Sequence, residues 1–151
     1  VRVFGNAFPP GSDKDQVIEN VGACLAQIAE HAEGTGVDCN LEMHGDFYYW
    51  EYTLRAVQLA NHDRIGIVYN CDPRETKWGP ISTFLNPVAP YLRHIHLHNL
   101  EDPKYPYPEL FRILRNMGYA EYMSLEAGGS EDPERVIALY ARLFEWMYWN
   151  S

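Results

Sequence analysis

RHIHLHN, residues 93–99, places three histidines at every second position: His94, His96 and His98. Alternate side chains of an extended strand point the same way, so the three imidazoles would share one face of a strand. The two apolar residues between them would share the opposite face. The stretch therefore predicts a strand that packs apolar side chains on one side and presents a row of imidazoles on the other.

Strand-like and helix-like segments alternate along the whole chain, and no linker divides it, so residues 1–151 are expected to form a single domain. The predicted strands cover residues 1–5, 37–45, 65–70, 92–99 and 122–128. Helical patterns cover residues 16–33, 48–62, 82–89, 106–118 and 132–149. Strands that alternate with helices favour parallel βαβ units. The fold class is therefore α/β, as an open doubly wound sheet or a (β/α)8 barrel.

The ends of the predicted strands favour the barrel. The sequence contains no G-x-G-x-x-G and no Walker A motif, which argues against a doubly wound sheet of the usual nucleotide-binding kind. A barrel places its chemistry on inward-pointing residues at the C-terminal ends of the strands. In residues 39–45, Leu41 and Met43 are apolar and would face the helices, so Glu42 would face the interior. The same alternation predicts three more inward polar residues at strand ends: Asn70, His96 and Glu126.

These four residues follow one another at intervals of 28, 26 and 30 positions, close to the spacing of the strands themselves. Two carboxylates, an amide oxygen and an imidazole are costly to bury without partners. A divalent cation would remove that cost, and this set of ligands suits Mn²⁺, Co²⁺, Mg²⁺ or Zn²⁺. The pattern therefore predicts a metal site formed by four consecutive strands.

The composition and charge of the chain indicate which classes of binding partner are disfavoured. The formal net charge is −9, from 12 basic and 21 acidic residues, which disfavours nucleic acid and anionic membrane surfaces as partners. No stretch approaches the roughly 20 apolar residues of a membrane span. The three cysteines, Cys24, Cys39 and Cys71, are too few and too widely spaced for a disulfide framework. We expect buried free thiols in a cytoplasmic protein.

Five stretches together resemble the later strands of the xylose-isomerase-like barrels, a family that includes sugar epimerases and isomerases and the inosose and dehydroshikimate dehydratases. The stretches are VRVFGN, LEMHGDF, IGIVYN, LRHIHLHN and GYAEYMSLEAG. The resemblance implies that Glu42, Asn70, His96 and Glu126 hold a divalent metal. It also implies that Glu42 and Glu126 act as base and acid on a sugar or polyol, through an enediolate intermediate.

The sequence departs from the family pattern at two of these strand ends. Asn70 stands where most members carry Asp, which would weaken metal binding, and Asp72 is a second choice for that ligand. His98 and Asn99 replace a Lys-Asp pair, so a lysine that commonly meets the substrate is absent. These departures leave open a non-enzymatic binding module with a vestigial site, beside the isomerase or epimerase and a dehydratase of the same fold.

Residues around the predicted ligands receive secondary roles. His44 and His98 are expected to contact the substrate, and His94, deeper in the strand, to pack beneath the site. Trp78 and Phe47 are candidates for the wall that covers one face of a sugar. The DNA-repair nucleases of the same fold are disfavoured, because they need more metal ligands and a basic surface.

The stretch VRVFG resembles the fourth strand of the barrel, so the chain would supply strands four to eight with their helices. A closed parallel barrel needs eight strands, because open edges otherwise remain. We expect the chain to be the C-terminal part of a longer barrel. The alternative is that two copies of the chain assemble a composite homodimer.

Overall fold

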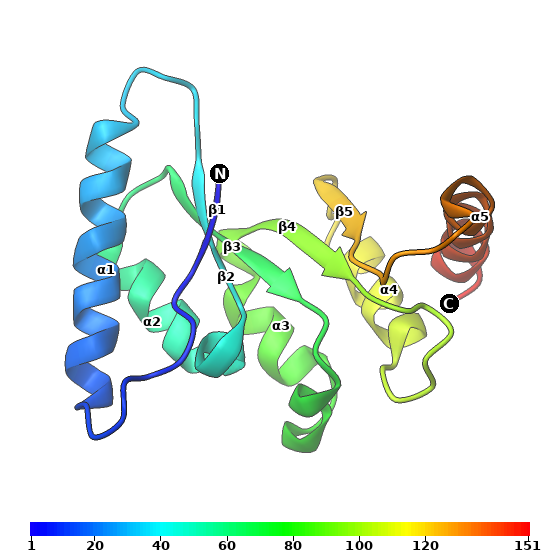
Figure 1. Cartoon of the computed structure of the whole chain (residues 1–151), viewed down its shortest axis with the longest axis horizontal. Coiled ribbons are helices and arrows are strands. Elements are labelled where there is room, and N and C mark those ends of the chain that lie inside the picture. Colours follow the sequence, from blue (N-terminus) through cyan, green and yellow to red (C-terminus); the bar gives the residue numbers. More distant parts are fainter.

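The computed structural model describes residues 1–151 and contains one curved parallel sheet (Figure 1). Five strands pair in sequence order, β1-β2-β3-β4-β5, and every pair is parallel. This is the predicted α/β arrangement and forms part of a TIM barrel. The strands are β1 (Arg2–Phe4), β2 (Cys39–Glu42), β3 (Ile65–Asn70), β4 (Leu92–Leu97) and β5 (Tyr122–Leu125).

A helix follows each strand, and in Figure 1 the helices succeed one another in chain order from α1 at one end of the molecule to α5 at the other. Short 3-10 helices, η1 (Gly45–Tyr48), η2 (Pro73–Trp78) and η3 (Ala89–Tyr91), lie in the connections. No helix combines the length and apolarity that crossing a membrane requires. The α-helices are α1 (Lys14–His31), α2 (Trp50–Ala60), α3 (Ser82–Val88), α4 (Tyr107–Asn116) and α5 (Pro133–Asn150).

Helix boundaries follow local capping chemistry. The Asp13 carboxylate accepts hydrogen bonds from the first turn of α1, and Asp132 caps α5, with Pro133 as the first helical residue. Gly118 ends α4 with a φ of 70°. The second helix begins at Trp50 and not at residue 48 as predicted, because residues 45–48 first form the tighter turn of η1.

The hydrophobic core lies between the sheet and the helices, and the alternation in the strands was predicted correctly. In β3, Ile65, Ile67 and Tyr69 belong to the core cluster of 27 buried residues, whereas Val68 and Asn70 point to the opposite face. The sheet therefore has an apolar outer face under the helices and a polar inner face.

The prediction that all three cysteines are buried is wrong for one of them. Cys39 and Cys71 are buried, but Cys24 is exposed, and all three are free thiols. The buried residues of α1 are Ile18, Gly22, Leu25 and Ala29. This stripe follows the three-and-four spacing of an amphipathic helix, and Cys24 falls outside it.

The two edges of the sheet remain open. β1 pairs only with β2, and β5 pairs only with β4. The last helix, α5, contains no fully buried residue, and four of its large apolar side chains are exposed: Ile137, Leu139, Trp146 and Trp149. An apolar surface of this kind is typical of an element that packs against a further neighbour.

A buried carboxyl group joins β3 to the loop that follows β4. Glu75 of η2 is fully buried, and its Oε1 accepts hydrogen bonds from the hydroxyls of Tyr69, at 2.5 Å, and Tyr105, at 2.7 Å. Its other oxygen has no hydrogen-bond partner. Burial raises the pKa of the Glu75 carboxyl from 4.5 to about 8, so the protonated form is favoured in the folded protein.

The Glu75 carboxyl should make stability depend on pH. Its contribution is fully present below the ordinary pKa of 4.5 and is lost as the pH rises to about 8, because ionisation is easier in the unfolded chain. Glu75→Gln stays neutral, so we expect a smaller loss of unfolding free energy between pH 5 and pH 8.5, measured by urea denaturation. Glu30→Gln, an exposed change on α1, is the control. An unchanged pH dependence in Glu75→Gln would contradict the assignment.

Candidate metal centre

The four predicted ligands lie at the carboxyl edge of the sheet. Glu42 is the last residue of β2, Asn70 is the last residue of β3, and His96 is the last but one of β4. Glu126 directly follows β5, and its backbone amide donates to the carbonyl of Leu97. Because the strands are parallel, these ends all meet at the same edge of the sheet.

Three of the four side chains come together. The His96 Nδ1 lies 2.7 Å from Glu42 Oε1 and 3.5 Å from Glu126 Oε2. One nitrogen or oxygen from each of these three residues lies within 4.8 Å of the others. Glu42 is only 1% exposed, so its carboxylate depends on positive or hydrogen-bonding partners. Two carboxylates and an imidazole at this separation suit a divalent cation.

Asn70 makes its contact with a different residue. Its Oδ1 lies 2.6 Å from His98 Nε2, and the other ring nitrogen of His98 lies 3.0 Å from the carbonyl oxygen of Glu126. Asn70 is opposite His96 in the register between β3 and β4. Asp72, the second choice, accepts three hydrogen bonds from the Arg74 side chain and caps η2.

The two other histidines that were assigned from the sequence, His94 and His44, lie outside the three-residue group. His94 is half-buried below His96, and its Nε2 lies 2.5 Å from Ser124 Oγ. Burial and the neighbouring His96 ring lower the pKa of His94, which favours its neutral form. His44 is exposed beyond the end of β2, and its ring centre lies 5.4 Å from that of Phe4.

Arg2 is a member of the site that was not predicted from the sequence. Its Nη1 lies 3.1 Å from Glu42 Oε1 and 3.6 Å from Glu126 Oε1. Arg2 pairs with Asn40 across β1 and β2, on the inward side of the strand. The signal was present in VRVFG, where the apolar Val1 and Val3 alternate with Arg2. This alternation directs Arg2 to the inner face of the sheet, so Arg2 could have been assigned to the site from the sequence.

A cavity of about 250 Å³ adjoins the group at the ends of β3, β4 and β5. The loop that follows β4 lines it, and this loop is held to the start of α4, where the Tyr107 hydroxyl accepts a hydrogen bond from the backbone amide of His98. The cavity can therefore admit a small polar molecule beside Glu126. Its lining includes Cys71, His98, Asp102, Tyr105, Tyr107 and Glu126.

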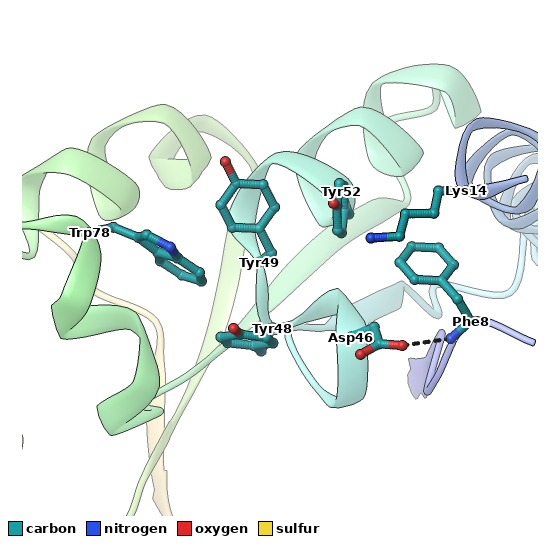
Figure 2. Close-up of a pocket in the computed structure, with 7 residues that line it drawn as sticks. All are labelled: Phe8, Lys14, Asp46, Tyr48, Tyr49, Tyr52 and Trp78. Atoms are coloured by element: carbon teal, nitrogen blue, oxygen red, sulfur yellow. Dashed lines mark hydrogen bonds between the residues drawn. The ribbon is translucent and has the colours of Figure 1, made fainter. Parts of the chain in front are cut away.

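A larger, aromatic cavity of about 390 Å³ lies among the loops that follow β1, β2 and β3 (Figure 2). The rings of Tyr48 and Trp78 stack with centres 5.2 Å apart, and Tyr49 meets Trp78 edge-on at 4.7 Å. Figure 2 shows the ammonium group of Lys14 pointing toward the space between the rings. Asp46 forms part of the wall and accepts a hydrogen bond from the backbone amide of Phe8.

Of the two candidates for a sugar wall, one lines a cavity and the other is buried in the core. Trp78 lines the aromatic cavity, as the assignment required. Phe47 is wrong, because it is fully buried and packs its ring against Phe8 at 5.3 Å and beneath Gly5. Phe47 is the third residue of η1, and the tight turn directs its ring into the core while Tyr48 faces the cavity.

Comparisons with known proteins agree with this architecture. A family model described as "Xylose isomerase-like TIM barrel" matches residues 1–148. No curated protein sequence matches the chain. Among solved structures, a D-tagatose 3-epimerase-like protein superposes with a TM-score of 0.78 at 18% identity, covering 97% of this chain and 62% of that one. An L-ribulose 3-epimerase gives 0.72 at 19% identity, covering 86% and 49%.

A third structure, D-psicose 3-epimerase from Clostridium cellulolyticum H10 with D-tagatose, gives a TM-score of 0.64 at 20% identity and covers 79% of this chain. The chain spans between 46% and 62% of the length of these three structures. At these identities the likeness extends to the fold.

Proposed function

The chain belongs to the xylose isomerase-like TIM barrel family, and from this premise we propose that it carries the catalytic edge of a divalent-metal-dependent sugar isomerase or epimerase. The observation that carries the proposal is the convergence of Glu42, His96 and Glu126, with ligand atoms within 4.8 Å of one another at the carboxyl edge of the sheet. The structural neighbours, which include enzymes named as ketose 3-epimerases, support a sugar as the substrate.

The side chains of the site would have two tasks, binding of the metal and transfer of protons to and from the substrate. A divalent cation held by Glu42, His96 and Glu126, with the Asn70 amide oxygen as a fourth ligand, would supply the positive charge that stabilises charge developing on substrate oxygens. Glu42 and Glu126 contact His96 from β2 and from the end of β5. One carboxylate would remove the proton next to a carbonyl, which leaves an enediolate, and the other would return a proton.

His98 would orient the substrate in the cavity beside Glu126. Its ring lies between the Asn70 side chain and the carbonyl of Glu126, so its position is already defined by two contacts. The cavity it lines would receive the reacting end of a small sugar or polyol. His44, which is exposed beyond the end of β2, would be a second contact for the substrate.

The aromatic cavity would bind the part of the substrate that does not react. Tyr48, Tyr49 and Trp78 present rings against which the apolar face of a sugar can pack, and Asp46 and Lys14 could bind its hydroxyls. This cavity follows the carboxyl ends of β1, β2 and β3, and the metal group lies at the carboxyl ends of β2, β4 and β5, so both belong to the same edge of the sheet. A substrate would then extend along this edge from Glu126 toward the aromatic rings.

We further propose that the chain is the C-terminal part of a longer cytoplasmic barrel. Three more strand-helix units would pair with the open edges of β1 and β5 and would cover the apolar side chains of α5. The spans of 46% to 62% of the similar structures support this view. A homodimer that closes a composite barrel is the alternative arrangement.

Activity should be assayed on the protein that contains this chain, loaded with Mn²⁺ and offered ketoses, inososes and dehydroshikimate in D₂O. We expect a ketose to be converted to its epimer or aldose isomer, with deuterium appearing at the carbon that changes configuration, detected by NMR. Turnover confined to the inososes or dehydroshikimate would assign a dehydratase in place of an epimerase. Absence of any turnover would favour the vestigial binding module.

The histidines of β4 provide a test of the ligand assignment. His96→Ala should weaken Mn²⁺ binding more than about 100-fold, because a direct ligand is lost. His94→Ala should keep the metal and lose about 1 to 3 kcal/mol of unfolding free energy, because its contact with Ser124 is removed. Calorimetric titration measures the Mn²⁺ affinity of each variant, and thermal melts measure the loss of stability. Loss of metal in His94→Ala, with retention in His96→Ala, would place the ligand two residues earlier.

The role of the aromatic cavity can be tested separately from the metal. Trp78→Ala should raise the KM for the sugar about tenfold, which corresponds to about 1.4 kcal/mol, while Mn²⁺ affinity stays unchanged. Met117→Ala, at the C-terminal end of α4 and outside the aromatic cavity, is the control, because this residue is 38% exposed. Equal KM values in the two variants would separate this cavity from substrate binding.

A further inference from the structure

Arg2 occupies a position among the candidate ligands that calls for an explanation. Its guanidinium contacts Glu42 at 3.1 Å and Glu126 at 3.6 Å, and these are the two carboxylates of the candidate metal centre. Arg2 therefore bridges the carboxylates of β2 and β5 from β1, the strand at the edge of the sheet. Apart from the His96 imidazole, it is the only basic side chain within 4.0 Å of either carboxylate.

The contacts of Arg2 use the same oxygen that His96 uses. Glu42 Oε1 lies 3.1 Å from Arg2 Nη1 and 2.7 Å from His96 Nδ1. A carboxylate oxygen has two lone-pair positions, so an oxygen that accepts two such hydrogen bonds has no free position for a cation. A metal held between Glu42 and His96 would have to displace the hydrogen bond between them and would lie next to the guanidinium.

The charges of the site also indicate that Arg2 and a divalent cation cannot both contact these carboxylates. Glu42 and Glu126 carry two negative charges, and Arg2 cancels one of them. With a divalent cation on the same carboxylates, the guanidinium would add a like charge at short range, which is repulsive in a partly buried site. The two partners also differ in freedom to move, since the Arg2 side chain is 43% exposed and that of Glu42 only 1%. Arg2 is therefore the group that would move.

We propose that Arg2 is a built-in competitor for the metal: it holds the Glu42 and Glu126 carboxylates together without a cation and must leave them when a cation binds. This inference rests on the proposed metal site. Arg2 would thus stabilise the metal-free protein and lower its affinity for metal, so that only a cation of sufficient charge and concentration replaces it.

The test compares Arg2→Met, which removes the charge and keeps the apolar stem, with Arg2→Lys, which keeps a charge. In the full chain, calorimetric titration with Mn²⁺ should show about tenfold tighter binding for Arg2→Met, or about 1.4 kcal/mol, and near wild-type affinity for Arg2→Lys. Melting in EDTA should show a lower Tm for Arg2→Met than for the wild type, and Mn²⁺ should raise its Tm by more. Arg64→Met, which breaks a surface ion pair with Asp38, is the matched control.

The Mn²⁺ titrations of the wild type and of Arg2→Met distinguish the role of Arg2 from the existence of the metal site. Equal or weaker Mn²⁺ binding by Arg2→Met, with a wild type that binds the metal, would overturn the role of Arg2 and leave the metal site standing. Absence of Mn²⁺ binding in both proteins would overturn both. Binding only by Arg2→Met would support the competition. If Arg2→Met does not fold in EDTA, Arg2→Gln, which keeps hydrogen-bond donors without the charge, should show the same gain in affinity.

Discussion

The buried carboxylate of Glu42 is the constraint on which the inner face of the sheet depends. A carboxylate that is 1% exposed is tolerated only with positive or hydrogen-bonding groups around it, and these groups must come from other strands. Arg2 reaches it from β1 and His96 reaches it from β4. Glu126 is then drawn to the same two partners from beyond β5. The partial barrel is thus joined across its inner face by one network of charges, while its outer face is joined by apolar packing.

The two faces of the sheet use different kinds of stabilisation, and the outer face has a polar exception. Glu75 is as buried as Glu42, yet it lies among tyrosines and not among cations. The tyrosine hydroxyls can donate to its carboxyl but cannot balance a charge, so burial favours the protonated form. Glu42 lies among basic groups that can balance its charge. One residue type therefore meets two electrostatic environments within a single sheet, and only one of them is suited to cation chemistry.

Most of the fold could be predicted from the sequence, because strand alternation, helix caps and the βα order are local signals. The inward parity of Glu42, Asn70, His96 and Glu126 was predicted from the apolar residues beside them. Pairwise contacts across strands could not be predicted in the same way. The contact of Asn70 with His98, and not with the three-residue group, depends on the register between β3 and β4, which shifts between Ile67 and Val68. Parity alone carries no information about such a shift.

The strand order has a consequence for the way the molecule folds. Each strand pairs only with the strands next to it in the chain, so every βα unit can add to the preceding one as it leaves the ribosome, without waiting for a distant segment. The polar inner face assembles later. Glu42 and His96 are 54 residues apart in the sequence, whereas Glu42 and Arg2 are 40 residues apart. Because the pairing of β1 with β2 closes the shorter loop, Arg2 can contact Glu42 before His96 does. Arg2 can therefore supply the counter-charge of Glu42 while β4 is still unpaired.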